Sequence, residues 1–158
     1  MSIDPRELRN VMGHFATGVT IITTKDNTGK PFGLTANAFS SLSLAPPLVL
    51  VCVDKTVDCY ACFEDSKVFA VNFLSEEQEQ LSRRFATKGI EKFEGVACRS
   101  GELGTPLLEG TLGHIVCKVV NSYEGGDHTI YVGEIQGASA SGDRPLLFFK
   151  GKYYRLPS

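Results

Sequence analysis

The chain has 158 residues, of which 42% are hydrophobic and 22% charged, and its formal net charge is −2. This composition is that of an ordinary globular protein and excludes disordered and fibrous classes. The length fits a single domain over residues 1–158, and the charge balance offers no basic stripe for nucleic acid. The longest apolar run, at 48–53, is far too short for a membrane helix.

The N-terminus and the cysteines both indicate a cytoplasmic protein. Residues 1–5 lack the basic and apolar regions of a signal peptide, so we expect none. Five cysteines, an odd number, predict reduced thiols. Cys59 and Cys62 form a C-x-x-C pair, which is typical of a redox dithiol or half of a zinc site. Zinc needs about four ligands and no second pair exists, so two small residues on a short helix are the favoured interpretation.

A helix is expected first along the chain. Asp4 can cap a helix that begins at Pro5, and Gly18 is a plausible end. Apolar residues at helical spacing predict one buried face, formed by Leu8, Val11, Met12 and Phe15.

The rest of the chain is expected to form mainly strands. Runs of apolar and β-branched residues bounded by turn residues predict strands at 19–24, 32–38, 48–53, 68–74, 112–123, 128–136 and 146–149. The continuously apolar run at 48–53 is typical of a strand buried on both faces. Gly125 and Gly126 supply the turn between the two long strands.

Two further helices are expected between strands. One is short and covers 59–64, and the other begins with a capping box at 75–78 and runs to about Phe85. Many strands, few helices and frequent turns predict a closed or nearly closed β-barrel rather than a parallel sheet.

Several common catalytic motifs are missing from the sequence. There is no glycine-rich dinucleotide or P-loop fingerprint, no G-x-S-x-G elbow, and no metal-ligand spacing among His14, His114 and His128. Rossmann, P-loop, serine hydrolase and metalloenzyme functions therefore lose most of their support.

Four groups of residues can carry chemistry, and each also has a purely structural explanation. Residues 33–43, GLTANAFSSLS, can line a narrow polar site or form a polar turn. Arg83 and Arg84 end the third expected helix, where arginine grips phosphate or favours the helix C-terminus. Histidine side chains serve acid–base and hydrogen-bonding roles, and His128 lies at a turn-to-strand junction beside an acidic residue, although an exposed turn histidine has the same pattern. Tyr153 and Tyr154 can stack on a planar ring or close the barrel.

Five segments in this order carry a resemblance that covers nearly the whole chain. They are FATGVTI at 15–21, GLTANAFSSLS at 33–43 with PPL at 46–48, RRF at 83–85, GDHT at 126–129 with GE at 133–134, and PLLFFKG at 145–151. Together they resemble the short-chain flavin reductase family, the small reductase components of two-component flavin monooxygenases.

The resemblance implies an FMN-binding split barrel of Greek-key type, usually a homodimer with flavin near the subunit interface. It implies NAD(P)H-dependent reduction of FMN or FAD that supplies reduced flavin to a partner monooxygenase. Flavin contacts are implied for Gly33, Thr35, Ala36, Asn37, Ser40, Ser41, Val53, Asp54, Lys55, Cys59, Tyr60, Arg84, Phe85 and His128. Of these, His128 matches the histidine on the nicotinamide side, and we expect it to orient the nicotinamide or the flavin edge and not to act as a nucleophile.

Two other functions need the same pocket and stay open at this point. One is a flavoprotein that passes electrons to ferric iron or to a protein acceptor. The other is a non-enzymatic module that only holds FMN. The sequence chooses neither between NADH and NADPH nor between FMN and FAD.

Overall fold

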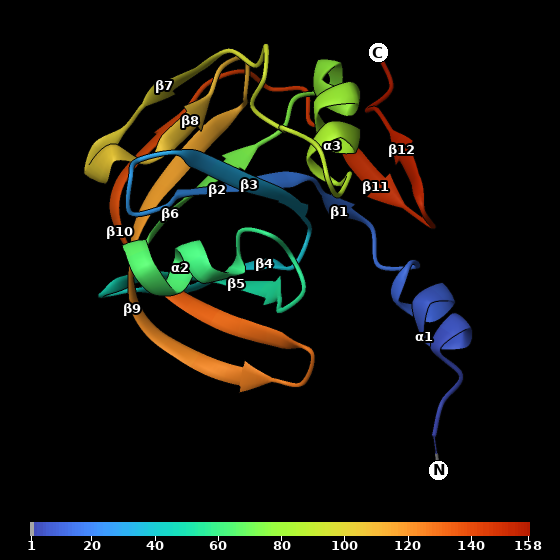
Figure 1. Cartoon of the computed structure of the whole chain (residues 1–158). Coiled ribbons are helices and arrows are strands. Elements are labelled where there is room, and N and C mark those ends of the chain that lie inside the picture. The colour runs from blue at the N-terminus through green and yellow to red at the C-terminus, as the bar shows by residue number, and fades with distance from the viewer. Residues whose placement is uncertain (1) are drawn as a thin grey trace.

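A computed structural model describes residues 2–158 and is built mainly from antiparallel strands (Figure 1). The helices are α1 (Pro5–Met12), α2 (Tyr60–Ser66) and α3 (Glu79–Phe85), with single 3₁₀ turns at η1 (Glu76–Gln78) and η2 (Glu102–Gly104). The strands are β1 (Thr17–Gly18), β2 (Thr20–Lys25), β3 (Pro31–Ala36), β4 (Phe39–Leu44), β5 (Pro47–Asp54), β6 (Val68–Phe73), β7 (Cys98–Ser100), β8 (Pro106–Leu108), β9 (Gly113–Gly125), β10 (His128–Ala140), β11 (Leu147–Phe149) and β12 (Lys152–Tyr154).

Seven of these strands form one curved sheet in the order β3-β2-β6-β9-β10-β5-β4. The edge strands β3 and β4 are consecutive in the chain and are joined only by residues 37–38. Two residues span only about 7 Å, so the sheet curls until these strand ends meet. Within residues 2–158 no strand pairing joins β3 to β4. The barrel is therefore split along a seam, defined here as the line between β3 and β4.

The smaller elements cover the ends of the barrel. A second sheet has the order β1-β11-β12, and β7 pairs with β8. Helix α3 packs against β2 and β3, and α2 packs against β2. The main core lies between α2 and the large sheet, where Phe63, Phe69 and Tyr131 are completely buried. No helix among the described residues is long and apolar enough to cross a membrane.

The burial of strand β5 differs from the prediction. Its side chains alternate in burial, since Val49, Val51 and Val53 are buried whereas Leu50 and Cys52 are half-buried. The prediction of a strand buried on both faces is wrong, because one face of β5 packs in the barrel and the other remains partly open. An apolar run does not by itself distinguish these two environments.

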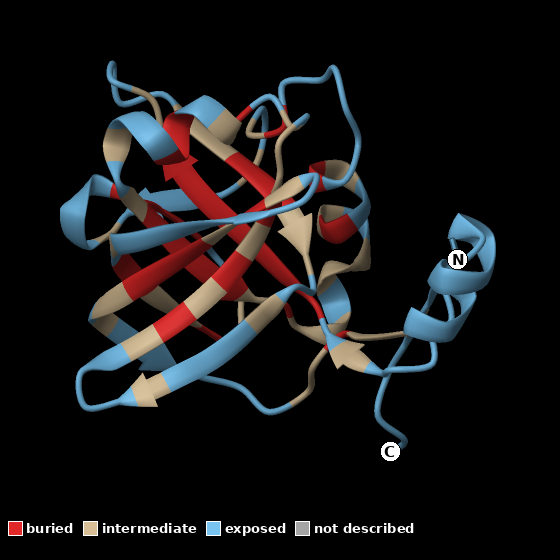
Figure 2. Cartoon of the chain, turned by 90° about the horizontal axis from the view of Figure 1, so that it is seen from below, coloured by how far each residue is buried: buried red, intermediate tan, exposed pale blue. Residues whose placement is uncertain are grey.

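Helix α1 begins as expected, because the Asp4 carboxylate accepts a hydrogen bond of 2.6 Å from the Arg6 N–H. It ends at Met12, well before Gly18, which lies in β1. Its apolar face was expected to be buried but is open to solvent, with Met12 63% exposed. Figure 2 shows α1 exposed along its length and set apart from the barrel.

Two local expectations about turns are refined by the structure. The segment after residue 38 is not a polar turn but strand β4, which pairs with β5. The hairpin between β9 and β10 turns at Gly126 and Asp127, one residue later than expected, because His128 already pairs with Gly125. The capping box is confirmed, since the Ser75 N–H donates to Gln78 Oε1 at 3.0 Å.

Candidate active site

A pocket of about 280 Å³ lies at the end of the seam. Its walls come from β3, β5, β10, the segment before α2, and the end of α3 with the loop that follows. The lining residues are Leu34, Thr35, Ala36, Asn37, Ala38, Cys52, Asp54, Val57, Asp58, Phe85, Ala86, Lys88, Lys92 and His128. Because these residues come from segments far apart in the chain, the pocket exists only once the barrel has curled.

The end of strand β3 brings Thr35 and Ala36 to the mouth of the seam, and Asn37 follows directly in the connection to β4. The Thr35 hydroxyl donates to the Ser82 carbonyl at 2.6 Å, so this group ties β3 to α3 and is not free to donate elsewhere. The Asn37 amide donates to the Thr17 hydroxyl at 3.3 Å, which leaves its carbonyl oxygen available. Asn37 is therefore the polar group that this stretch can offer to a planar polar ring.

A second hollow of about 220 Å³ adjoins the pocket. It shares Thr35, Ala36, Asn37 and Ala86 with the pocket and adds Val19, Phe148 and Tyr153. The Tyr153 hydroxyl is bonded to the Ser82 hydroxyl at 2.6 Å, so the tyrosine both closes this end of the barrel and lines the hollow. The two hollows together offer apolar walls on both sides of residues 35–37.

Two lysines make one side of the pocket basic. The Lys92 ammonium donates to the Gly33 carbonyl at 3.1 Å and lies 3.9 Å from the Asp58 carboxylate, and only 9% of its side chain is exposed. Lys88 lies nearer to solvent, with its ammonium 3.4 Å from the Thr56 hydroxyl. Each ammonium carries three donors, so both keep N–H groups for an anion in the pocket.

Arg84 supports the loop that carries these lysines. Its guanidinium donates to the carbonyls of Lys92 at 2.7 Å, Glu91 at 2.8 Å and Glu94 at 3.0 Å. The side chain does not line the pocket. In the structure, Arg84 fixes the loop over β3, and Lys88 and Lys92 are the basic groups at the pocket itself.

His128 and Asp54 face each other at the opposite side of the pocket. They pair across β5 and β10, and the imidazole Nδ1 lies 2.7 Å from the Asp127 carboxylate. The Asp54 carboxylate accepts hydrogen bonds from the Thr56 N–H and hydroxyl, at 2.7 and 2.8 Å. These bonds, helped by the charges of His128 and Lys88, lower the pKa of Asp54. The pocket therefore carries a negative charge beside the imidazole.

The sequence matches the family model described as "Flavin reductase like domain" over residues 12–157. The chain belongs to the flavin reductase-like family. It is 45% identical over 153 residues to the reductase subunit HsaB of a flavin-dependent monooxygenase from Rhodococcus jostii, covering 96% of this chain and 78% of that protein. It is 40% identical to an NADH-dependent FAD reductase from Streptomyces globisporus, covering 97% of this chain and 87% of that protein.

A solved structure of a flavin reductase-like protein has the same fold. The NADH:FAD oxidoreductase SgcE6 of Streptomyces globisporus, in complex with NAD and FAD fragments, superposes with a TM-score of 0.91 at 39% identity, over 99% of this chain and 97% of that one. The family and the mainly β, split-barrel fold predicted from the sequence are thereby confirmed.

The pocket contains only some of the residues that the sequence predicts as flavin contacts. It is lined by Thr35, Ala36, Asn37, Asp54, Phe85 and His128. Phe85 is completely buried and packs edge-on against Phe93, at 5.0 Å between ring centroids. The ring thus forms an apolar wall under the loop that carries the lysines.

The remaining expected residues lie outside the pocket lining. Val53 and Cys59 are completely buried in the core, and burial raises the pKa of the Cys59 thiol to about 12. Ser40 and Ser41 lie exposed on the edge strand β4. The other four residues make structural contacts. The Gly33 carbonyl accepts a hydrogen bond from Lys92, and Arg84 donates to the loop that follows α3. Lys55 and Tyr60 contact the β9–β10 hairpin.

Sequence reasoning missed Lys88 and Lys92 as pocket residues. Nothing in the local sequence shows that the charged loop after Phe85 folds back over β3. The contact between Lys92 and Gly33 spans 59 residues of chain. The only local sign of these pocket residues is that the loop after Phe85 carries two lysines four positions apart.

Proposed function

We propose that the protein is an NAD(P)H-dependent flavin reductase that reduces FMN or FAD and supplies the reduced flavin to a partner monooxygenase. One observation carries the proposal: the pocket at the seam combines apolar walls with two lysines on one side. A flavin mononucleotide is a large, flat, mostly apolar ring with a phosphate on a flexible chain, and this combination fits it. The relatives named as monooxygenase reductase components support the same function.

The chain's own groups would divide the work of binding. Residues 35–37 would contact the ring, and the Asn37 side-chain carbonyl would be the acceptor for a polar ring edge. Lys88 and Lys92 hold the phosphate, since their ammonium groups are the cations of the pocket. Phe85 and Leu34 provide apolar contact.

Flavin, when bound, supplies the hydride acceptor and the nicotinamide supplies the hydride. The protein has to hold two flat rings in contact, with the reacting atoms roughly 3–3.5 Å apart. In this proposal His128 orients the nicotinamide, and two observations support the role: His128 lines the pocket, and its Nδ1 lies 2.7 Å from the Asp127 carboxylate. No general base is needed for hydride transfer, so the imidazole works by orientation and hydrogen bonding.

We also propose a homodimer that works in the cytoplasm. The apolar face of α1 is left uncovered, and Phe15, which follows it, is 75% exposed. Phe15 also lines an apolar hollow of about 470 Å³ that includes Asn37, so a second copy seated there would lie close to the flavin pocket. All five cysteines are free, as expected in a reducing compartment. Sedimentation velocity of the wild type and of Phe15→Ser tests the dimer.

The reductase function is tested by anaerobic mixing of the protein with each flavin and each nicotinamide. Loss of the visible flavin absorption at a catalytic rate with NADH or NADPH is the expected result. Bound flavin that neither nucleotide reduces would refute the reductase and leave a flavin-binding module. Replacement of His128 by Ala should raise the nicotinamide KM or lower kcat while flavin binding survives, and an unaltered kinetic profile would remove His128 from the site.

A further inference from the structure

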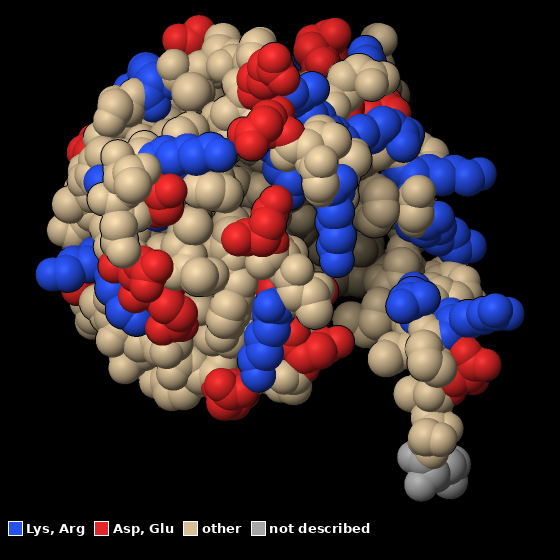
Figure 3. Space-filling view, in the orientation of Figure 1, with Lys and Arg blue, Asp and Glu red and all other residues tan. Residues whose placement is uncertain are grey.

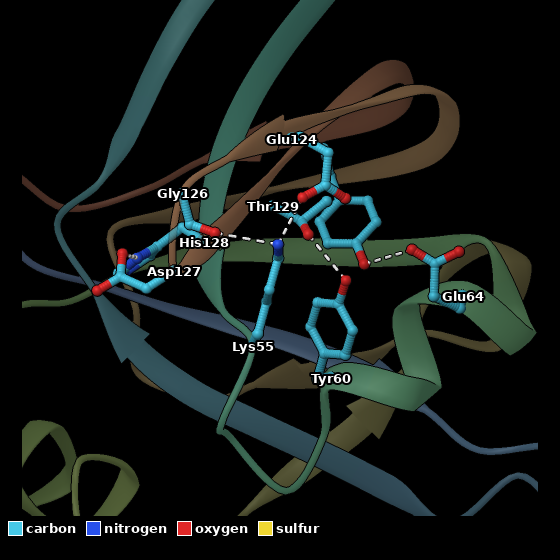
Figure 4. Close-up of polar contacts among 9 residues, drawn as sticks. Lys55, Tyr60, Glu64, Glu124, Gly126, Asp127, His128 and Thr129 are labelled. Carbon is cyan, nitrogen blue, oxygen red and sulfur yellow. Dashed lines mark hydrogen bonds and ion pairs between the residues drawn. The ribbon is translucent and has the colours of Figure 1, made fainter.

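Lys55 contacts the turn between β9 and β10 through both its backbone and its side chain. Its N–H donates to the Asp127 carbonyl at 3.0 Å. Its ammonium donates to the Gly126 carbonyl at 3.0 Å and forms an ion pair with the Glu124 carboxylate (Figure 4). Lys55, the residue that follows β5, therefore binds three residues of this hairpin.

The turn that Lys55 contacts leads directly into His128. Gly126 has a φ of +76°, as expected for a two-residue hairpin turn with glycine first. Asp127 follows, and its carboxylate holds the His128 imidazole at 2.7 Å. The Asp127 and Glu124 side chains are 89% and 81% exposed, so packing contributes little to the order of the turn.

A second tether holds the residue on the other side of His128. The Tyr60 hydroxyl is bonded to the Thr129 hydroxyl at 2.8 Å, and the two side chains approach each other in Figure 4. His128 therefore lies between two tethers, and both originate in residues 55–60. The Lys55 side chain itself does not line the pocket.

We propose that Lys55 is a positioning residue, which fixes the turn of the β9–β10 hairpin and through it the place of His128 at the pocket. This inference rests on the proposed function, in which His128 orients the nicotinamide. Lys55 thus governs nicotinamide use and leaves flavin binding unchanged. The neighbouring Tyr60–Thr129 bond keeps β10 itself in register when the lysine is removed.

The test compares Lys55→Met, which keeps the apolar stem, with Lys55→Arg, which keeps the charge. The matched control is Lys118→Met, an exposed lysine on β9 of the same hairpin. We expect Lys55→Met to change the kinetic parameter that His128→Ala changes, by about two- to fivefold, because exposed charge contacts are individually weak. Lys55→Arg should recover most of the loss, and Lys118→Met should match the wild type.

A double-mutant cycle decides whether Lys55 acts through the histidine. If it does, Lys55→Met adds no further loss in a His128→Ala background. Fully additive losses, or a rise in the flavin KM with no change for the nicotinamide, would overturn the inference.

The positioning role of Lys55 can be tested separately from the reductase function, by a measurement that does not require turnover. In two-dimensional NMR spectra of the full-length protein, Lys55→Met should shift and broaden the backbone amide signals of Asp127 and His128, and Lys55→Arg should not. Unchanged signals in Lys55→Met overturn the positioning role. Failure of the wild type to reduce flavin, with these signals changed as expected, overturns the reductase function and leaves the tether established.

Discussion

Replacement of Lys92 by methionine tests the phosphate side of the pocket most directly. Lys92 is 9% exposed, and its ammonium reaches the pocket while donating to the Gly33 carbonyl at 3.1 Å. Methionine keeps an unbranched stem that packs adaptably, and it removes the charge together with the hydrogen bond to the Gly33 carbonyl. The pairing with Asp58 is loose, at 3.9 Å, and Asp58 is 51% exposed. The ammonium is therefore available to a bound phosphate.

The expected loss follows from one charge-assisted hydrogen bond. Such a bond contributes about 1.5–3 kcal/mol, which corresponds to a rise of about 10- to 150-fold in the Kd for FMN. Riboflavin lacks the phosphate, so its Kd should be the same for wild type and variant. Lys88→Met should raise the Kd for FMN by a smaller factor, because Lys88 lies nearer to solvent.

The assay is titration of flavin fluorescence with protein, with FMN and riboflavin side by side at low ionic strength. The thermal midpoint of each variant serves as a check of folding. An equal loss of affinity for both ligands would indicate damaged packing and refute the reasoning. An unchanged Kd for FMN would place the phosphate elsewhere.

Three further outcomes are expected from the structure. Gly33→Ala should lower the free energy of unfolding by about 1–3 kcal/mol, because the new methyl would lie 2.9 Å from Phe85; thermal unfolding measures this. Asn72→Ala should lower it by about 2–4 kcal/mol in a urea titration, because the buried amide makes three hydrogen bonds that join β2, β6 and β8. With a thiol reagent near neutral pH, exposed Cys98 should react first. Cys117 should react only on unfolding, because burial raises its thiol pKa to about 12 and the reactive thiolate is scarce.

Matched variants control the first two outcomes, and a labelling rate decides the third. Gly18→Ala adds a methyl with nothing within 4 Å, so it should leave stability unchanged, and an equal loss there would contradict the steric reasoning. Asn121→Ala removes an exposed amide from β9 and should be neutral in urea. Fast labelling of Cys117 in the folded protein would show that the core opens more readily than its burial implies.

The charged residues of this protein are unevenly distributed, although the net charge of −2 is small. Figure 3 shows Lys and Arg side chains gathered on the side of the molecule that carries α1, α3 and β12. The last turn of α3 alone contributes Arg83 and Arg84. This basic side lies beside the pocket that we propose for a phosphorylated ligand, so attraction of anions toward it should weaken as salt is raised.

The local sequence predicted the structure correctly where the stabilising contacts join residues that are close together in the chain. The capping box of Ser75 and Gln78 involves residues three apart, and the Asp4 cap involves residues two apart. Local patterns could not decide whether a face is buried. The helical spacing that predicted a buried face on α1 is present, yet no described residue covers it. Burial depends on what packs against an element, which its own sequence does not contain.

The sequence by itself determined the family and the order of most strands and helices, and it predicted residues 35–37 and His128, which the structure brings to one pocket. Only the tertiary structure decided that β3 and β4 curl together into an open seam, that Lys92 lies buried beside Gly33, and that Arg84 supports a loop instead of lining the pocket. The physical reason is chain distance. Hydrogen bonds and caps within a few residues follow from local sequence, whereas the pocket is made by side chains that meet only when distant strands close the barrel.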